Sequence, residues 1–337
     1  MEYKERPDYG HGYRKTYIEG LEMLLAARRA QCAQIRERFI ASVAEEREDY
    51  RRQYLDMLGW PLNEPPHPVL DVIENKMFEN EEMIITRMQF EVFPGVKFYG
   101  ILFRLKSDRP LPLVISQHGG AGTPELCSSF YDSANYNDMT DRILKQGVHV
   151  FAPQLSLWHA DNGIPTHRQD FDNSFKQVGG SIAAVEIYCL QRCLDYFDGC
   201  SFTNGRYGMV GLSYGGFYTL YTAAADPRIL AALSCSHFND REKYNWADKC
   251  FKNASNTFLD AQVGALVCPR YLRIEVGDND ELFDVQGAID EYEQLKAYYA
   301  EAPEQLEFHV FKGVHEFCPH EDDTGIIKVV ERLKGEF

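Results

Sequence analysis

Hydrophobic and polar positions follow a helical rhythm in the first part of the chain. Over residues 14–58, apolar or small side chains recur every three or four positions, as on one face of a helix. They are Ile18, Leu21, Leu25, Cys32, Ile35, Phe39 and Val43. Four prolines then end any helix: Pro61, Pro65, Pro66 and Pro68. The pattern predicts a helical hairpin packed on the rest of the protein. The alternative is an oligomerisation arm, because the apolar stripe is long and its spacing is nearly that of a heptad repeat.

From residue 82 the rhythm changes to short apolar runs. Residues 83–90 and 96–103 read as an antiparallel hairpin with a turn between them. Further strands are predicted at 113–116, 148–152, 207–210, 231–235, 271–276 and 306–311, alternating with helices at 135–146, 181–198, 214–225, 285–300 and 323–335. Such alternation is typical of a mostly parallel sheet covered by helices on both faces.

The expected architecture is therefore an α/β fold with a mostly parallel, eight-stranded sheet. We expect two parts, an N-terminal helical segment and linker over residues 1–80 and an α/β domain over 81–337. The hydrophobic fraction of 45% and the charged fraction of 26% are those of an ordinary globular protein. No apolar run is long enough for a membrane helix, and the N-terminus lacks the apolar segment of a signal peptide. The nine cysteines then indicate free thiols, so we expect a cytoplasmic protein.

The net charge of −16 is unevenly distributed. Residues 1–58 contain 11 basic and 11 acidic side chains, so the whole imbalance lies beyond them. An acidic body repels phosphate backbones and anionic lipid, so we expect neither nucleic acid nor a membrane as a partner. The expected partner is a small, neutral or cationic molecule. The neutral helical segment is least repelled by a copy of itself, so a homo-oligomer is expected to form through it.

The segment from Gly211 to Gly215 carries the strongest chemical signal, Gly-x-Ser-x-Gly. It lies between a predicted strand and a predicted helix, which is the context of a nucleophile elbow. A serine on such a tight turn adopts strained dihedral angles, and the two glycines remove β-carbons that would clash. The N-terminal amides of the following helix point at the site. An ordinary strand-to-helix turn that happens to contain serine is the alternative. We predict Ser213 as a catalytic nucleophile.

A glycine-rich segment after an earlier strand predicts the oxyanion hole. Glycines at 119, 120 and 122 allow backbone N–H groups to approach a tetrahedral intermediate closely. The amide of Tyr214, which follows the nucleophile, is one expected donor. The amide of Gly120 is the other, with those of Gly119 and Ala121 as alternatives. The spacing does not spell the G-x-G-x-x-G of a nucleotide loop, and no cofactor or metal is expected.

The acid of a catalytic triad is expected after the serine and before the histidine. Residues 274–283 contain several carboxylates at the end of a predicted strand, on the same rim as the serine. Asp280 is the preferred acid, with Asp278 and Asp284 as alternatives. Glu275 lies within the strand and is less suited to reach the rim.

His315 is the predicted base, because it follows the last predicted strand. Its ring would take the proton from Ser213, and Asp280 would hold the other ring nitrogen. A surface or structural histidine is the alternative. Activity is expected to fall on acidification, because the base must start neutral.

Taken together, these motifs resemble those of the α/β-hydrolase superfamily, and within it the acetyl xylan esterase, cephalosporin C deacetylase and dienelactone-hydrolase-like group. The resemblance covers about residues 80–337. Its main segments are Gln117-His-Gly-Gly, Gly211-Leu-Ser-Tyr-Gly-Gly, Ile274-Glu-Val-Gly-Asp-Asn-Asp and Gly313-Val-His-Glu-Phe. It implies an α/β-hydrolase fold and a metal-free Ser–Asp–His triad, and it supports Asp280. The chain departs from the group at Gly120, where the acetyl esterases usually carry an aromatic residue, and at Tyr214, where they usually carry glutamine.

Two loops after strand ends are expected to bind substrate, through Trp158, His159 and His237. Aromatic side chains mixed with polar groups suit stacking on a sugar, although such loops also simply cover a sheet. The function expected is a serine carboxylic ester hydrolase that deacylates small neutral carbohydrate or related esters. A serine peptidase or amidase of the same fold and a non-catalytic binding protein are the alternatives.

Overall fold

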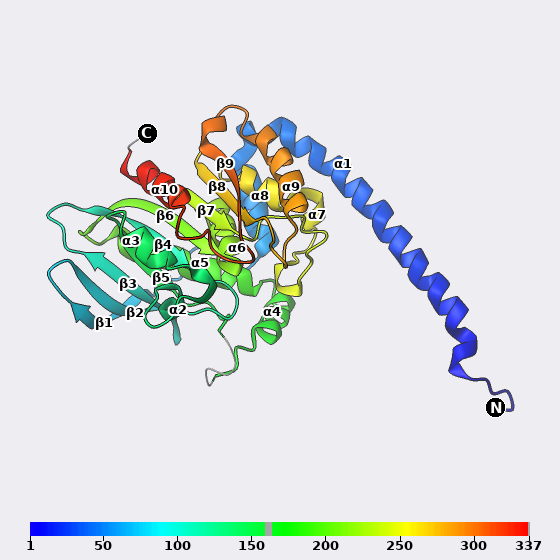
Figure 1. Ribbon diagram of the computed structural model, residues 1–337. Coiled ribbons are helices and arrows are strands. Elements are labelled where there is room, and N and C mark those ends of the chain that lie inside the picture. Colours follow the sequence, from blue (N-terminus) through cyan, green and yellow to red (C-terminus); the bar gives the residue numbers. More distant parts are fainter. Residues whose placement is uncertain (159–163, 336–337) are drawn as a thin grey trace.

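The structure is a computed structural model that describes residues 1–158 and 164–335 (Figure 1). Within these residues one nine-stranded sheet has the order β1-β2-β3-β5-β4-β6-β7-β8-β9. The strands are β1 (Asp71–Glu79), β2 (Met83–Phe93), β3 (Val96–Leu105), β4 (Leu111–Gln117), β5 (His149–Pro153), β6 (Thr203–Leu212), β7 (Ile229–Cys235), β8 (Tyr271–Gly277) and β9 (Leu306–Phe311). The first three strands and β5 pair antiparallel, and every pair from β5 through β4 to β9 is parallel. The mostly parallel sheet is confirmed, with one strand more than the predicted eight.

The additional strand is β1, which lies inside the predicted linker and forms an antiparallel edge beside β2. Its side chains are almost all exposed, and its apolar residues come in adjacent pairs rather than in alternation. An exposed edge strand of this kind has no buried face to produce a period-two pattern. The sheet therefore begins at Asp71, within the segment 1–80 that the sequence assigned to helix and linker.

Helices cover both faces of the sheet, as the alternating pattern predicts. One face packs against α3 (Met139–Leu144) and α10 (Thr324–Lys334), and the other against α5 (Ile182–Asp198), α6 (Tyr214–Ala225) and α8 (Asp260–Ala265). Successive strand residues enter opposite cores, so that Leu113 and Ile115 lie on one side and Val114 on the other. The remaining helices are α2 (Pro124–Cys127), α4 (Arg168–Gln177), α7 (Ala254–Thr257) and α9 (Val285–Tyr298).

The N-terminal segment is helical over α1 (His11–Leu58), which consists of two helical limbs joined by a kink with non-helical dihedral angles at Glu46. Beyond Glu46 the helix is anchored in the protein. The Tyr54 hydroxyl donates to the carbonyl of Tyr221 at 3.0 Å, and the Arg51 Nε donates to the carbonyl of Ala224 at 2.9 Å. Both acceptors lie in α6, so this limb packs directly on the helix that follows the predicted nucleophile.

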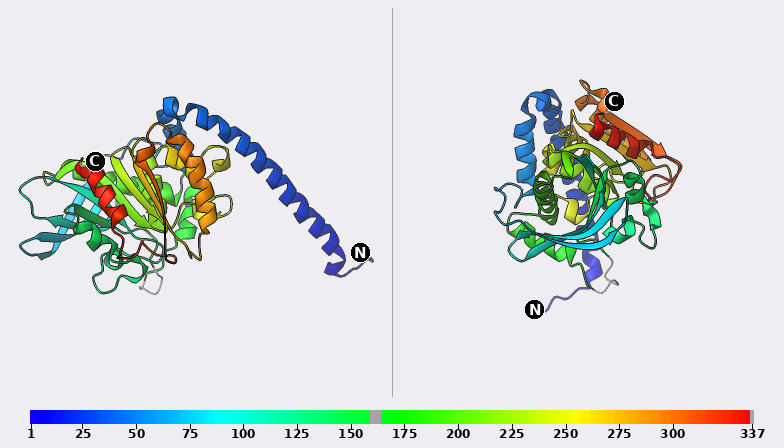
Figure 2. Two further views of the ribbon diagram at one scale, coloured as in Figure 1. Left: turned by 45° about the horizontal axis from the view of Figure 1, so that its top comes forward. Right: turned by 90° about the vertical axis from the view of Figure 1, so that its left-hand side faces the viewer.

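The first half of α1 extends away from the sheet into solvent (Figures 1 and 2). Phe39 and Val43 are still buried, and Arg29 donates to the carbonyl of Glu242 at 3.0 Å. Residues 11–31, here called the arm, are otherwise largely exposed. One limb of α1 thus packs on the body, as expected for this segment, and the other projects from it. That the projecting limb joins two copies stays a prediction. None of the helices in the described residues is long and apolar enough to cross a membrane.

Candidate active site

Ser213 occupies a sharp turn between the end of β6 and the start of α6. Its φ of 60° and ψ of −118° lie in a region that side chains other than glycine rarely adopt. The Ser213 N–H donates to the carbonyl of Cys235 at 2.8 Å, and its own carbonyl accepts from the Phe217 N–H at 2.9 Å. The neighbouring strand and the helix therefore hold the strained backbone from both sides.

The glycines around Ser213 have the steric role that the sequence predicts. A β-carbon at Gly211 would come closer than 3.0 Å to the backbone of Gly215. A β-carbon at Gly215 would also come closer than 3.0 Å to the backbone of Gln117. A β-carbon at Gly119 would lie 2.7 Å from the carbonyl oxygen of Leu212. Three backbone segments meet here with no space for a methyl group between them. Their contact places the loop after β4 directly against the serine.

The structure narrows the choice of the second oxyanion donor. The amide of Gly119 donates to the hydroxyl of Tyr136 at 2.9 Å, so it is not free to bind an oxyanion. Gly120 lies beside the elbow, since a β-carbon on it would be 3.5 Å from the Tyr214 ring. Tyr214 is the first residue of α6, so its amide has no intrahelical acceptor. The pair of Tyr214 and Gly120 remains available, with Ala121 as the alternative.

His118 fixes the shape of this loop. Its ring is completely buried, and burial lowers its pKa to about 4. The Nε2 atom accepts from the Leu155 N–H at 3.0 Å, which leaves the Nδ1–H to donate to the carbonyl of Gly119 at 2.8 Å. The ring is therefore neutral and carries its proton on Nδ1.

Asp280 and His315 form the pair that the sequence predicts. The His315 Nδ1 atom lies 2.9 Å and 3.1 Å from the two carboxylate oxygens of Asp280. The same carboxylate accepts from the amides of Leu282 and Phe283. Burial raises the pKa of Asp280. The hydrogen bond and charge of His315, together with the hydrogen bonds from the two amides, lower this pKa by more, so it lies below its usual value. Asp280 is thus held ionised, and it orients the histidine ring.

The other carboxylates of this region are engaged elsewhere. Asp278 accepts from the amide of Gly313 at 3.0 Å. Asp284 caps α9 by accepting from the Gly287 amide at 2.7 Å. Glu275 is buried in β8 and pairs with Arg273 at 2.6 Å. Asp278, Asp284 and Glu275 thus each have a structural partner other than His315.

Ser213 and His315 share the rim formed by the carboxyl ends of the parallel strands. The two are tied through β7, because the Glu316 carbonyl accepts from the Ser236 hydroxyl at 3.3 Å and Cys235 binds the Ser213 amide. In the described residues no hydrogen bond joins the Ser213 hydroxyl to His315. In many hydrolases this bond tightens only when substrate is bound.

A row of aromatic rings runs from Tyr214 to His315. Tyr214 stacks on Trp246 with centroids 5.9 Å apart, Trp246 contacts Phe283 at 5.5 Å, and Phe283 contacts the His315 ring at 5.7 Å. The Lys249 ammonium position lies 3.8 Å from the Tyr214 centroid. Burial lowers the pKa of Lys249 well below its usual value. Lys249 was not among the predicted site residues, because nothing in its local sequence shows that the folded chain buries it.

A buried charge cluster supports this wall of rings and was also not predicted. Arg168 pairs with Glu186 and with Asp248, each at 2.7 Å. The Tyr214 hydroxyl donates to the same Asp248 carboxylate at 3.0 Å. The partners lie on α5, on α6 and in the loop before α7, so only the folded chain brings them together. A cavity of about 350 Å³ opens beside them, lined by Thr166, His167, Arg168, Gln169, Asp170, Tyr214 and Asp248.

The three predicted substrate-binding residues have different outcomes. Trp158 bridges to Ala121 in the oxyanion loop, and its indole N–H donates to the carbonyl of Ile164 at 2.6 Å. His237 is a correction, because its side chain is 0% exposed and lies behind the rings of Phe217 and Phe283 rather than on a surface that substrate could reach. His159 lies outside the described residues.

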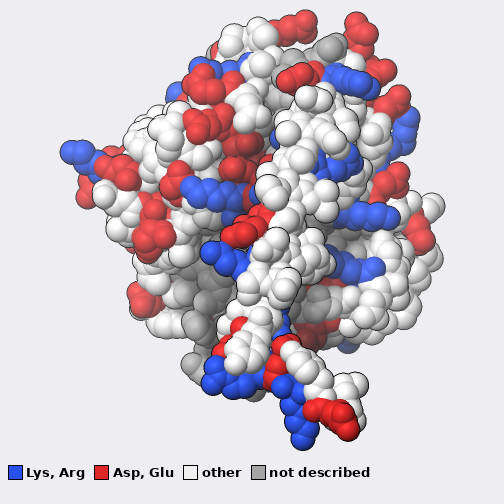
Figure 3. Space-filling model, turned by 90° about the vertical axis from the view of Figure 1, so that its right-hand side faces the viewer, with Lys and Arg blue, Asp and Glu red and all other residues white. Residues whose placement is uncertain are grey.

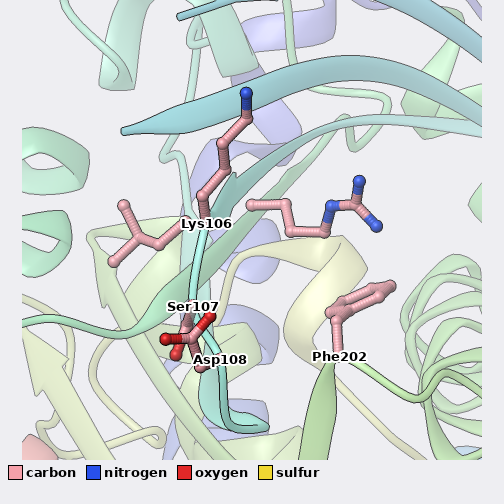
Figure 4. A pocket seen from close by; sticks show the side chains of 6 residues that line it. Lys106, Ser107, Asp108 and Phe202 are labelled. Atoms are coloured by element: carbon pink, nitrogen blue, oxygen red, sulfur yellow. The ribbon is translucent and has the colours of Figure 1, made fainter. Parts of the chain in front are cut away.

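A larger cavity, of about 440 Å³, lies at the opposite end of the sheet (Figure 4). It is formed by the segment from Arg104 to Asp108 together with Phe202, where β4 begins rather than where it ends. The loops that carry Ser213, Asp280 and His315 contribute nothing to it. We therefore do not assign it to the same chemistry.

One group in the described residues has metal-ligand character. The side-chain ligand atoms of His309, Cys318 and Asp322 lie within 4.8 Å of one another. His309 and Asp322 already form an ion pair at 3.2 Å. The positive charge of Arg273 acts on both Cys318 and Asp322, and it opposes a bound cation. We therefore assign this group a structural role.

Because His118 is neutral in the folded protein, its contribution to the stability of the fold should depend on pH. The pKa of His118 is about 4 in the folded protein and about 6.5 in an unfolded chain, so the group stabilises the fold above pH 6.5. This contribution shrinks as the pH falls and is lost below pH 4. Replacing His118→Gln should therefore destabilise the protein at pH 7, and the difference from wild type should narrow by up to about 3 kcal/mol towards pH 4. Urea unfolding at both pH values measures it, and a constant difference would contradict the assignment.

Comparison with known proteins agrees with this architecture. A family model described as X-Pro dipeptidyl-peptidase (S15 family) matches residues 190–308. The putative hydrolase YtaP of Bacillus subtilis is 23% identical over 271 residues, covering 75% of this chain and 88% of YtaP. A glucuronoyl esterase from Solibacter usitatus superposes with a TM-score of 0.67 at 12% identity, covering 87% of this chain and 93% of that one. Acetyl xylan esterase 1 from Thermoanaerobacterium sp. superposes with a TM-score of 0.57 at 14% identity, covering 85% and 94%. The chain has the α/β-hydrolase fold.

Proposed function

We propose that the protein is a serine carboxylic ester hydrolase that works through an acyl-enzyme. The observation that carries the proposal is the Asp280–His315 hydrogen bond of 2.9 Å on the rim that also holds the strained Ser213. A nucleophile, a base and an orienting acid in this relation are the parts of a hydrolytic triad. The amides of Tyr214 and Gly120 add a place for a developing negative charge.

The roles follow from the geometry. Asp280 accepts the Nδ1–H of His315, so the free Nε2 atom is the one that takes the Ser213 hydroxyl proton as the oxygen attacks the ester carbon. The amides of Tyr214 and Gly120 bind the oxyanion, aided by the positive N-terminal end of α6. His315 then protonates the leaving alcohol. Water, activated by the same histidine, hydrolyses the acyl-enzyme.

The surroundings favour a small neutral ester, in particular an acylated carbohydrate or a related compound. The rings of Tyr214 and Trp246 form an apolar wall next to the oxyanion donors, and sugars stack on such rings. The net charge of −16 repels an anionic substrate. The structurally similar proteins include a glucuronoyl esterase and an acetyl xylan esterase, which supports this class without identifying the compound.

We place the protein in the cytoplasm, because all nine cysteines are free thiols. Seven of them are buried, and no cysteine takes part in the proposed chemistry.

A serine peptidase or amidase is the second candidate. The family model that matches residues 190–308 describes a dipeptidyl-peptidase, and the matched segment includes Ser213 and Asp280. It includes neither His315 nor the oxyanion loop. The same triad cleaves esters and amides on different members of a fold, so the match leaves the bond type to experiment.

Replacing Ser213→Ala tests the nucleophile. We expect the turnover of p-nitrophenyl acetate to fall by about 10⁶-fold, as when the serine of a triad is removed from other hydrolases. The matched control is Ser174→Ala, because Ser174 is exposed on α4. A fluorophosphonate probe should label the wild type at Ser213 alone. Undiminished turnover in Ser213→Ala, or labelling of another residue, would refute the assignment.

Replacing Asp280→Asn tests the acid against its nearest rival. An amide cannot stabilise the imidazolium and favours the wrong ring tautomer, so kcat should fall by about 10⁴-fold. Asp278→Asn should change kcat far less, because Asp278 binds a backbone amide and not the histidine. Both variants are compared by steady-state hydrolysis of p-nitrophenyl acetate. Equal losses in the two variants would mean that Asp280 is not the triad acid.

Matched ester and amide substrates separate the two candidate functions. We expect kcat/KM for p-nitrophenyl acetate to exceed that for the corresponding p-nitroacetanilide far beyond their difference in spontaneous hydrolysis. Acetylated sugars should then be hydrolysed, while an X-Pro anilide should not. Cleavage of the X-Pro anilide at the higher rate would establish the peptidase instead.

A further inference from the structure

The arm of α1, residues 11–31, presents an apolar stripe that nothing in the described chain covers. Tyr13, Tyr17, Ile18, Leu21, Leu24 and Leu25 are all exposed. At about 100° per residue, these side chains fall on one side of the helix. The same side carries Cys32, Phe39 and Val43, which are buried against the body. The stripe is therefore the direct continuation of a face that already packs.

We propose that two copies of the protein dimerise by packing these stripes together as an antiparallel pair of helices. The stripe has coiled-coil spacing, with Ile18 and Leu25 at a positions and Leu21 at a d position. The arm of 21 residues is about 30 Å long and covers three heptads. An isolated helix of this kind gains most of its stability from packing its apolar face.

The charge distribution favours the arm as the place where copies meet. Residues 1–58 are neutral, whereas residues 59–337 carry the whole net charge of −16. The arm itself, residues 11–31, carries four basic and two acidic side chains. Two acidic bodies therefore repel each other far more strongly than two arms do. Seen from the side on which the arm projects, uncharged surface runs along it between charged residues at its margins (Figure 3).

The positions of the charged side chains also favour an antiparallel over a parallel pair of helices. In a parallel pair, Arg14 and Arg28 occupy d positions and would each face their own copy. In an antiparallel pair centred between Ile18 and Leu21, Lys15 faces Glu22 of the partner subunit at neighbouring e positions, twice by symmetry. The antiparallel arrangement also places the two acidic bodies at opposite ends of the pair.

The first experiment measures the mass of the full-length protein at micromolar concentration by light scattering and sedimentation. We expect twice the 38.8 kDa of the chain for the wild type and a single chain for Leu21→Glu. The matched control is Met23→Glu, because Met23 is 70% exposed and points about 200° away from Leu21 on the same helix. This variant should remain a dimer. A wild type of single-chain mass, or a Leu21→Glu protein that stays dimeric, would overturn the proposal.

The second experiment tests the direction and does not depend on an apolar-to-charged change. Lys15→Glu and Glu22→Lys should each weaken the dimer, because each places like charges opposite one another in the antiparallel pair. The double variant should restore the dissociation constant to within a few-fold of the wild type. A parallel pair does not bring these two positions together, so the absence of restoration would overturn the antiparallel direction. Neither experiment measures hydrolysis, so both are independent of the proposed function.

Discussion

The active-site region depends on three backbone segments that touch without side chains between them. The β6–α6 turn, the end of β4 and the loop after it meet at Gly211, Gly215 and Gly119, where even a methyl group would overlap main-chain atoms. Because the contact is between backbones, its geometry is stiff and leaves no rotamers to vary. It determines how far the Tyr214 amide lies from the amides of the glycine loop. The geometry of the proposed oxyanion site is thus set by backbone packing.

Around this contact the protein uses buried polar groups as supports. His118 and Tyr136 hold the glycine loop from behind, and Arg168 joins α5, α6 and the loop at Asp248. Burial removes the hydration of each of these groups. Hydrogen bonds within the protein offset this loss for His118 and Arg168, and the Tyr136 hydroxyl accepts from the Gly119 amide. Removing a single partner would leave a buried charge or dipole unpaired. Such networks favour one arrangement of the loops over others that are nearly as compact.

The parts that the sequence predicted are those determined by neighbours along the chain. The turn at Ser213 is recognisable because its glycines lie two residues to either side, and the parallel strands are recognisable by their continuous apolar runs. The parts that the sequence could not predict depend on distant residues. The pairing of Arg168 with Asp248 spans 80 positions, the burial of Lys249 depends on rings from α6 and the loop after β8, and β1 has no buried face. The placement of His237 was wrong for the same reason, because a histidine after a strand looks the same whether it faces solvent or the core.

The attachment of α1 has a mechanical consequence. Tyr54 and Arg51 bind the carbonyls of Tyr221 and Ala224 near the far end of α6, and α6 begins immediately after Ser213. This helix of 12 residues is a stiff rod about 18 Å long. A tilt of the limb of α1 beyond Glu46 would therefore act on one end of α6, whose other end carries Ser213, the proposed nucleophile.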